Sequence, residues 1–372
     1  LVDRVLKNSE EYKVPNSTAE QLWKFMETDL TEAITSGKLT SKTSLEDRDG
    51  GTRATLEAAR CLLGKIYLYQ EKYADAKSEL EKVISSGKYD LIADVSTFYH
   101  PASAGCKEYV LECVRHYDPS NMYSQEGWFG ILANWGFGYG FIAGPEASMH
   151  YKFNTTSGYS YFNPSKSLYD AFVAEEGADG YRLNAWIRTW EQVIAMNIAV
   201  NTTTNKYASE GYFRLKWLAS TDDEFVGYWC GNQSNTPVIR YADVLLMAAE
   251  ACLQAGDQAG ADEYLGRVRD RARLPRKSHV TLSDIKLERR LELAMEGMRF
   301  QDLKRWGDAP AVLADKGKKL PTFQIVPDPN NDLTTAAGIY NARYTTKTTY
   351  VDNEKSLAGW TPNRDEWLPF PE

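Results

Sequence analysis

The sequence is poor in the residues from which metal sites and disulfide frameworks are built. Its 372 residues include five cysteines and four histidines, and no two cysteines form a C-x-x-C pair. Zinc sites usually show closely spaced cysteines or histidines, so neither a metal site nor a disulfide framework is expected. Cys61 and Cys252 lie in helical patterns and are expected to be small buried side chains. Whether Cys106 and Cys113 pair stays open.

Positive charge is also scarce. Lysine and arginine number 43 against 51 aspartates and glutamates, which gives a formal net charge of −8 at pH 7. A sequence-independent nucleic-acid binder needs a cationic surface to displace phosphate counterions, so no nucleic-acid partner is expected. The longest uncharged run, residues 127–145, contains six glycines. Because glycine weakens helices, we interpret this run as an extended loop or short strand rather than a membrane span.

Catalytic motifs are absent from the sequence. It contains no G-x-S-x-G turn, no G-x-x-x-x-G-K-[ST] loop and no H-E-x-x-H spacing. Carboxylate pairs such as Glu175 with Glu176, or Glu126 with Glu146, are available to a glycosidase mechanism. A chain with 51 acidic residues offers many such pairs, however. We therefore expect no catalytic residue and no cofactor.

Two helical hairpins are the clearest regular pattern in the chain. They span about residues 53–87 and 241–274, where apolar residues recur at helical spacing on both sides of a polar turn. Both follow a tetratricopeptide-like pattern, in which Ala76 is equivalent to Ala261. Each hairpin alone leaves an apolar face exposed. We therefore predict that the two pack side by side, although 185 residues separate these equivalent positions.

Two further segments are predicted to be helical. Residues 17–37 begin with a capping-box pattern and continue with apolar residues at helical spacing. Residues 283–306 carry an apolar stripe with many charges between its members. Within that segment Arg299, Asp302 and Arg305 follow one another at spacings of three, which makes them neighbours on one helix. We interpret these three as structural ion-pair residues rather than a catalytic site.

A long insert, about residues 100–236, separates the two hairpins. Residues 117–162 hold 13 aromatic side chains in 46 positions, against 12% aromatic residues in the whole chain. Glycine, asparagine and serine fill the gaps, which is typical of structured loops with short strands. The predicted fold class is therefore mainly α: tetratricopeptide-like helical hairpins with a long loop-rich, aromatic insert and a few short strands.

The aromatic loops have two interpretations. Their rings either pack inward as a core or form a surface on which sugar rings stack, with asparagine side chains binding the hydroxyls. Binding residues tend to collect in the connections of a rigid scaffold, so we favour a ligand surface. The candidate ligand-binding residues form two patches, the first with Trp128, Asn134, Trp135 and Tyr139, and the second with Tyr228, Trp229 and Asn232.

Motifs along the whole chain resemble the SusD/RagB-like outer-membrane nutrient-binding lipoproteins. Residues 239–251 resemble the R-Y-A-E-V-L-L-x-x-A-E-A helix of that family, and residues 292–307 resemble its E-L-A-F-E-G-x-R-F-x-D-L-x-R-W-G signature. Residues 51–89 fit its G-R-A-T and I-x-S-G-K-Y stretch. Residues 179–182 resemble its D-x-R element, and residues 367–371 resemble its L-P-I-P tail.

The resemblance implies a surface-exposed lipoprotein of the outer membrane that binds glycans without catalysis and delivers them to a SusC-like TonB-dependent transporter. It also implies one SusD-like domain over residues 1–372, with the N-terminal part, the signal peptide and the lipid-bearing cysteine missing. Two alternatives stay open: a RagB-like peptide-binding lipoprotein and a glycoside hydrolase on a helical scaffold. Aromatic, charge-poor loops favour sugars over peptides. The candidate residues rest on the aromatic pattern alone, because the family's binding positions vary.

Overall fold

The computed structural model of the chain is mainly helical. It describes residues 1–9, 12–114, 163–195, 206–207, 210–216, 235–332, 334–335, 337–338, 343–354, 359–362 and 364–365. Within these residues the strands form only two two-stranded sheets and one three-stranded sheet, all antiparallel. The predicted mainly α class is confirmed. None of the described helices has the length and apolar character needed to cross a membrane.

Along the chain, the helices and strands follow the order that the sequence predicts, with helical segments before and after the insert. The helices are α1 (Ala19–Thr35), α2 (Leu56–Tyr69), α3 (Tyr73–Ser85), α5 (Lys166–Glu176), α6 (Tyr181–Trp186), α7 (Trp190–Ala195), α8 (Tyr241–Gln254), α9 (Gln258–Arg271), α10 (Leu282–Glu292), α11 (Arg299–Arg305) and α12 (Ala309–Val312). The strands are β1 (Tyr109–Cys113), β2 (Ile187–Thr189), β3 (Lys206–Tyr207), β4 (Tyr212–Arg214), β5 (Thr236–Arg240), β6 (Lys319–Pro327) and β7 (Tyr344–Asp352).

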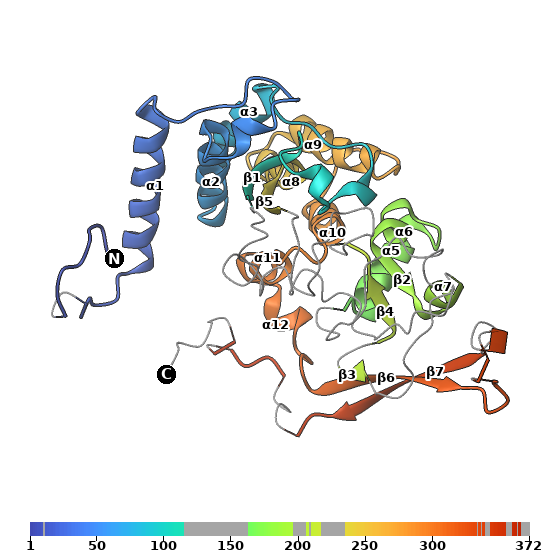
Figure 1. Ribbon diagram of the computed structural model, residues 1–372. Coiled ribbons are helices and arrows are strands. Elements are labelled where there is room, and N and C mark those ends of the chain that lie inside the picture. Colours follow the sequence, from blue (N-terminus) through green and yellow to red (C-terminus); the bar gives the residue numbers. More distant parts are fainter. Residues whose placement is uncertain are drawn as a thin grey trace, which may run out of the picture.

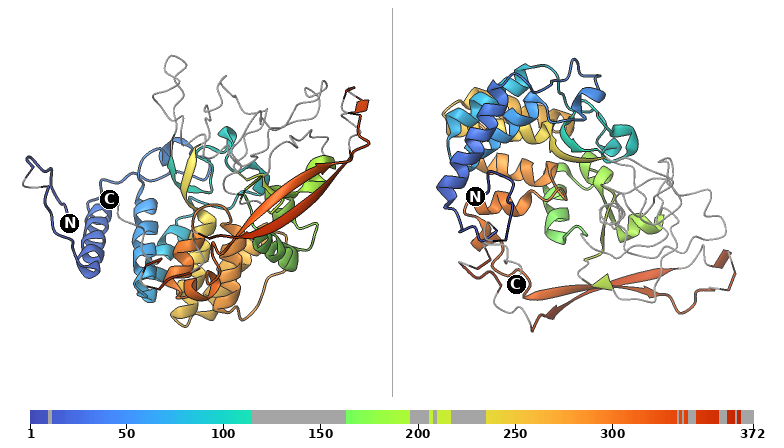
Figure 2. Two further views of the ribbon diagram at one scale, coloured as in Figure 1. Left: turned by 90° about the horizontal axis from the view of Figure 1, so that it is seen from below. Right: turned by 60° about the vertical axis from the view of Figure 1, so that its left-hand side comes forward.

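In space, the N-terminal helices and the pair α8–α9 line one side of the molecule, with α1 at the outer end (Figure 1). The strands β6 and β7 form a long ribbon on the opposite side, and both views of Figure 2 show it extending beyond the helices. Helix α1 packs against α2 through partly exposed residues, and none of its side chains is buried. Its predicted capping box is present, since Thr18 and Gln21 each bond the other's backbone amide.

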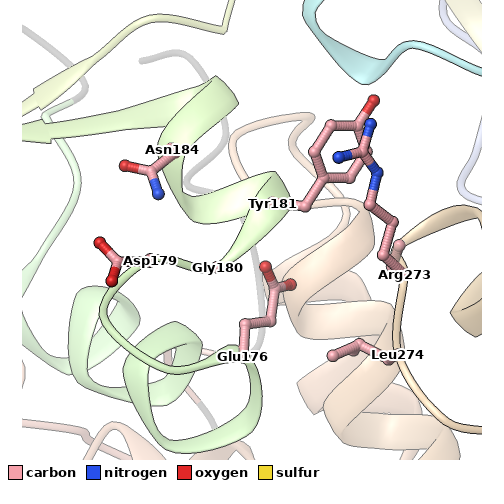
Figure 3. A pocket seen from close by; sticks show the side chains of 8 residues that line it. Glu176, Asp179, Gly180, Tyr181, Asn184, Arg273 and Leu274 are labelled. Carbon is pink, nitrogen blue, oxygen red and sulfur yellow. The ribbon is translucent and has the colours of Figure 1, made fainter.

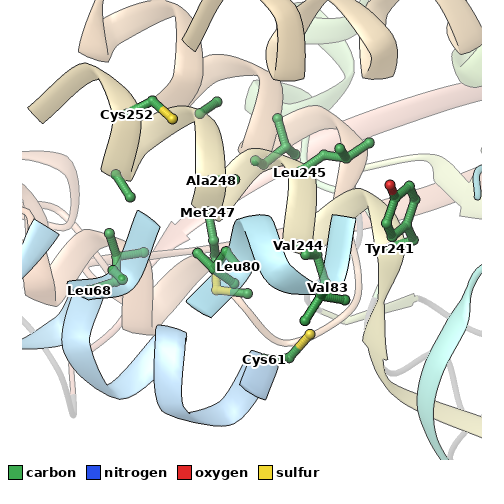
Figure 4. Packing of buried hydrophobic residues seen from close by; sticks show 14 of the residues in the cluster. Cys61, Leu68, Leu80, Val83, Tyr241, Val244, Leu245, Met247, Ala248 and Cys252 are labelled. Carbon is green, nitrogen blue, oxygen red and sulfur yellow. The ribbon is translucent and has the colours of Figure 1, made fainter. Parts of the chain in front are cut away.

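The two predicted hairpins pack side by side, as expected from their shared pattern. Helix α3 of the first lies against α8 of the second, and Leu80 and Leu245 are fully buried in one apolar cluster (Figure 4). Burying a leucine side chain stabilises a fold by about 1.5–3 kcal/mol. At the rim, Lys77 Nζ donates to Asp257 Oδ2 over 2.6 Å. This pairing of distant segments forms the main core of the scaffold.

Close approach within the first hairpin depends on Gly64 of α2. A Cβ atom at this position would lie 2.8 Å from Leu80 Cγ of α3, closer than carbon atoms normally approach. Cys61 and Cys252 are completely buried in the same cluster, as predicted. The other two described cysteines, Cys106 and Cys113, have free thiols, one buried and one exposed. The disulfide that the sequence left open is not formed.

The single helix predicted over residues 283–306 is wrong. Two helices, α10 and α11, occupy this segment, and Met295 and Gly297 between them have left-handed φ angles of 65° and 81°. The break has a tertiary cause: the carbonyls of Glu292 and Ala294 accept hydrogen bonds from the buried ammonium of Lys216. Bonds from outside the helix thus satisfy carbonyls at its C-terminal end, where intrahelical partners run out.

The described part of the insert is more helical than predicted. Helices α5, α6 and α7 all lie within it. Helix α5 begins where Ser165 Oγ accepts a bond from the Leu168 amide, and it buries Phe172 completely in a second apolar cluster. A single buried side chain such as Phe172 produces no repeating apolar pattern, so a helix that depends on it is hard to recognise in an aromatic-rich sequence. The sequence therefore predicts loops with short strands here, although this part of the insert forms helices and contributes to the core.

Candidate functional site

All seven predicted ligand-binding residues lie outside the residues that the structure describes. They are Trp128, Asn134, Trp135, Tyr139, Tyr228, Trp229 and Asn232. They belong to two segments, residues 115–162 and 217–234, whose flanking residues are described. The structure therefore establishes what holds the ends of these segments.

One end of each segment meets at the β1–β5 pair. Segment 115–162 follows β1 after Val114, and segment 217–234 precedes Asn235 and β5. The strands are antiparallel, so Cys113 lies opposite Thr236. Asn235 Nδ2 also donates to Glu112 Oε2 over 3.0 Å. Segment 115–162 thus begins, and segment 217–234 ends, next to the same end of this strand pair.

The other end of segment 217–234 is held by Lys216. Its side chain is completely buried, and Nζ donates to Glu296 Oε1 over 2.5 Å as well as to the carbonyls at the end of α10. The ammonium lies 3.8 Å from the centroid of the Trp186 ring, a distance at which a cation is attracted to the aromatic face. Burial lowers the pKa of Lys216 to about 8, against the attraction of Glu296.

Arg240, the last residue of β5, binds the same region. Its Nε donates to Glu296 Oε2 and its Nη2 to Glu296 Oε1, both over 2.8 Å. Its Nη1 lies 2.6 Å from Glu108 Oε1, just before β1. Lys216 and Arg240 thus fasten the residues on both sides of segment 217–234 to the break between α10 and α11.

These contacts belong to a larger buried network in which positive and negative groups alternate. Its members are Glu108, Glu176, Arg182, Lys216, Arg240, Arg269, Arg271, Glu288, Glu292 and Glu296. Burial alone would raise the pKa of Glu292, but Arg271, Arg240 and Arg182 hold it well below its usual range. Removing one partner of a buried pair is strongly destabilising because it leaves an uncompensated charge. The network therefore holds in place the residues near which both segments begin or end.

The carboxylates of Glu292 and Glu296 do not suit acid–base chemistry. A general acid or base works best with a pKa near the operating pH. The pKa values of Glu292 and Glu296 are instead lowered, and their oxygens accept bonds from arginine and lysine side chains. Both carboxylates are structural anchors.

The three charged residues predicted to serve structure divide into two cases. Asp302 accepts from Arg289 and Arg305, both over 2.9 Å, and Arg305 also binds the two oxygens of Glu250. These contacts support the structural interpretation. Arg299, in contrast, makes no hydrogen bond or ion pair with the described residues, so it has no place in this cluster.

A possible cation site at the contact between the hairpins is already satisfied by protein groups. Glu81, Cys252 and Asp257 offer three ligand atoms within 4.8 Å of one another. However, Lys77 Nζ lies 2.6 Å from Asp257, and Tyr264 donates to Glu81 over 3.0 Å. The group is a polar rim of the hairpin contact.

The sequence reasoning missed the buried network, although part of its signal was present. Arg240, Glu292 and Glu296 all lie in the helical motifs quoted from the sequence. Lys216 and Glu108 lie in no such motif. Their partners within the network are 76 or more residues away along the chain, so no local spacing connects them.

Comparison with known proteins gives a consistent result. Residues 107–371 match the SusD family. A SusD-like protein of Bacteroides ovatus is 42% identical over 77 residues, which cover 19% of this chain and 14% of the relative. The SusD-like protein P38 of Formosa agariphila is 36% identical over 157 residues, which cover 38% of this chain and 28% of the relative. The matches thus span less than a third of either curated relative.

Two solved structures add the fold of longer stretches. A laminarin binding SusD-like protein superposes with a TM-score of 0.70 at 30% identity, covering 85% of this chain and 68% of that protein. The surface glycan-binding protein A from Bacteroides thetaiotaomicron, in complex with laminarihexaose, has a TM-score of 0.61 at 25% identity. That match covers 79% of this chain and 63% of the other.

Proposed function

Because the chain belongs to the SusD family, we propose that it is a non-catalytic protein of the cell surface that binds a laminarin-type glycan. The observation that carries this proposal is the likeness to a laminarin binding SusD-like protein over 85% of the chain. A second relative of 25% identity is in complex with laminarihexaose. Both relatives make this hexasaccharide the first ligand to test.

The two aromatic patches are the proposed binding residues. Both lie in segments that have one end at the β1–β5 pair. Tryptophan and tyrosine rings suit the apolar faces of sugars, and asparagines suit their hydroxyls. The buried network that holds these two strands supplies the fixed support that a preorganised site needs.

The direct test is a calorimetric titration of the protein with laminarihexaose. Maltohexaose, a glucose hexamer with a different linkage, is the matched control ligand. We expect saturable binding of laminarihexaose, weaker binding of maltohexaose, and little dependence on salt, because the loops carry few charges. Saturable binding of a peptide library in place of both glycans would favour the peptide-binding alternative. Release of reducing sugar during incubation would favour the hydrolase alternative.

The proposed partner is a SusC-like TonB-dependent transporter, to which the bound glycan would be delivered. This proposal, and that of an outer-membrane lipoprotein, rest on family membership. Affinity purification of the full-length protein from its own membranes tests both. We expect a SusC-like protein to co-purify, and proteinase added to intact cells to degrade the protein. Protection from proteinase, with no transporter recovered, would contradict this part of the proposal.

A further inference from the structure

A cavity of about 370 Å³ lies between the α5–α6 turn and the end of α9 (Figure 3). None of its lining residues belongs to the two aromatic patches. They are Glu176, Asp179, Gly180, Tyr181, Asn184, Ala272, Arg273 and Leu274. We call it the Arg273 pocket. Its volume lies within the range of small-molecule sites, toward the lower end.

One wall of the Arg273 pocket is fixed by Glu176. Its Oε1 accepts from Arg182 Nε over 2.6 Å, and its Oε2 accepts from the Arg182 amide over 3.0 Å. Gly180 allows this approach, since a Cβ there would lie 2.4 Å from Glu176 Cβ. Glu176 therefore shapes the wall while its carboxylate is paired with Arg182.

The second fixed feature is the stacking of Arg273 on Tyr181. The Tyr181 hydroxyl accepts from the Val95 amide and donates to the Ala93 carbonyl, both over 3.2 Å, which immobilises the ring. Arg273 Cζ lies 3.7 Å from the centroid of that ring. The exposed guanidinium makes no hydrogen bond or ion pair with the described residues. Its N–H groups remain available to a ligand.

Two further polar side chains, those of Asp179 and Asn184, line the same cavity. Asp179 is exposed, and neither its carboxylate nor the side-chain amide of Asn184 bonds to any group in the described part of the chain. Figure 3 shows these two side chains on the α6 side, with Arg273 and Leu274 on the opposite wall. The lining thus holds the Arg273 cation, the Asp179 carboxylate, the Glu176 carboxylate that is paired with Arg182, one amide and an apolar surface.

We propose that the Arg273 pocket is a second saccharide-binding site, which takes a mono- or disaccharide unit of a neutral glycan. The balance of Asp179 against Arg273 disfavours a charged ligand. Planar carboxylate, amide and guanidinium groups are suited to paired hydroxyls, which donate and accept at once. Leu274 provides an apolar contact for the C–H groups of a sugar ring. The choice of a sugar among neutral hydroxyl-rich molecules rests on the proposed function.

The backbone offers a variant that removes the cation without unfolding the protein. Arg273 follows the C-cap of α9 with a φ of 61°, and its amide bonds to Asp270 while that of Leu274 bonds to Arg269. This is a Schellman motif, in which glycine is the favoured residue. Arg273→Gly should therefore preserve the fold, since relief of the left-handed backbone offsets the lost contact with Tyr181.

Glu71 provides a matched control in the same motif after α2. Its φ is 60°, and the amides of Glu71 and Lys72 bond to Leu68 and Tyr67. Glu71 does not line the Arg273 pocket. Glu71→Gly should likewise preserve the fold and leave sugar binding unchanged.

The experiment is a ligand-observed NMR titration with laminaribiose. It uses the parent protein and a variant without the three candidate tryptophans (Trp128→Ala, Trp135→Ala and Trp229→Ala). Arg273→Gly with Asp179→Ala, or Glu71→Gly, is then added to that triple variant. We expect the triple variant to retain saturation transfer. Arg273→Gly with Asp179→Ala should weaken it about tenfold, as for lost hydrogen bonds to charged groups, and Glu71→Gly should not.

The outcomes separate this proposal from the proposed function. Saturation transfer that disappears in the triple variant overturns the Arg273 pocket and leaves the aromatic patches as the whole site. Transfer that survives Arg273→Gly with Asp179→Ala also overturns it. Transfer that is the same in parent and triple variant, but is lost with the pocket substitutions, supports the pocket. That result would contradict the proposed role of the tryptophans instead.

Discussion

Lys216 and Arg240 share one oxygen atom of Glu296. Lys216 Nζ lies 2.5 Å from Glu296 Oε1, and Arg240 Nη2 lies 2.8 Å from the same atom. In the sequence, the two cations lie before and after segment 217–234, which carries the second aromatic patch. A single carboxylate between two helices thus joins the residues that flank a candidate binding segment.

Replacing Glu296 by glutamine should lower the free energy of unfolding by about 3 kcal/mol. The substitution keeps the shape of the side chain but leaves two buried cations without their common anion, and breaking a buried pair typically costs this much. Urea unfolding measures the effect. Glu263→Gln is the control, because its bond to Arg276 is exposed and should matter by less than about 0.5 kcal/mol. Equal stability of the two variants would contradict the anchoring role of Glu296.

Stability should depend on pH through Lys216. Its pKa is lowered to about 8 in the folded protein, while an unfolded lysine keeps a pKa near 10.5. At a pH between these two values the unfolded chain binds more protons than the folded chain. Raising the pH therefore stabilises the folded protein, because it removes the cost of burying a charged ammonium. Relative to Lys216→Met, the parent should gain up to about 1.4 kcal/mol per pH unit between pH 8 and 10.

The measurement is urea unfolding of both proteins across that pH range. Glu296, Arg240, Tyr99 and Trp186 surround the ammonium, and all remain in the Lys216→Met variant. Their own titration cancels in the comparison. A difference in unfolding free energy that stays constant from pH 8 to 10 would show that Lys216 does not titrate there.

The contact between Gly64 and Leu80 predicts a non-additive pair of substitutions. Gly64→Ala places a methyl group against Leu80 and should destabilise the protein by about 1–3 kcal/mol. Leu80→Ala removes a fully buried side chain and should cost about 2–5 kcal/mol. In the double variant the added methyl fills part of the cavity, so the combined loss should be smaller than the sum. Strict additivity in thermal or urea unfolding would refute this close packing.

Arg305 and Arg299 should differ sharply, although they lie on the same short helix. The Arg305 side chain is only 8% exposed and binds Glu250 and Asp302, so Arg305→Ala should destabilise the protein by about 3 kcal/mol. Arg299 makes no such bond in the described part of the chain, and Arg299→Ala should cost less than about 1 kcal/mol. Comparable melting temperatures for the two variants would contradict this assignment.

Periodic features of the sequence predicted the scaffold well. The small-residue pattern in which Ala76 matches Ala261 was enough to predict that the two hairpins pack side by side, which they do through α3 and α8. The break between α10 and α11 was missed, although Gly297 disfavours a continuous helix. Lys216, which binds the carbonyls at the break, lies 76 residues earlier and gives no local signal.

The candidate sites show the same limit. Aromatic composition alone led to Trp128, Trp135 and Trp229, and it gives no account of the residues that hold their segments. The Arg273 pocket escaped notice because Tyr181 and Arg273 lie 92 positions apart and share no motif. Only the fold brings them together.

The affinity for laminarihexaose of single tryptophan variants tests the central claim most directly. Calorimetry on the parent, Trp128→Ala, Trp135→Ala and Trp229→Ala proteins should show losses of about 2 kcal/mol, roughly thirtyfold, for the stacked anchors. Tyr12→Ala removes an exposed aromatic residue outside the insert and should bind as the parent does. If all three tryptophan variants remain folded and bind within about twofold of the parent, these rings do not form the glycan site.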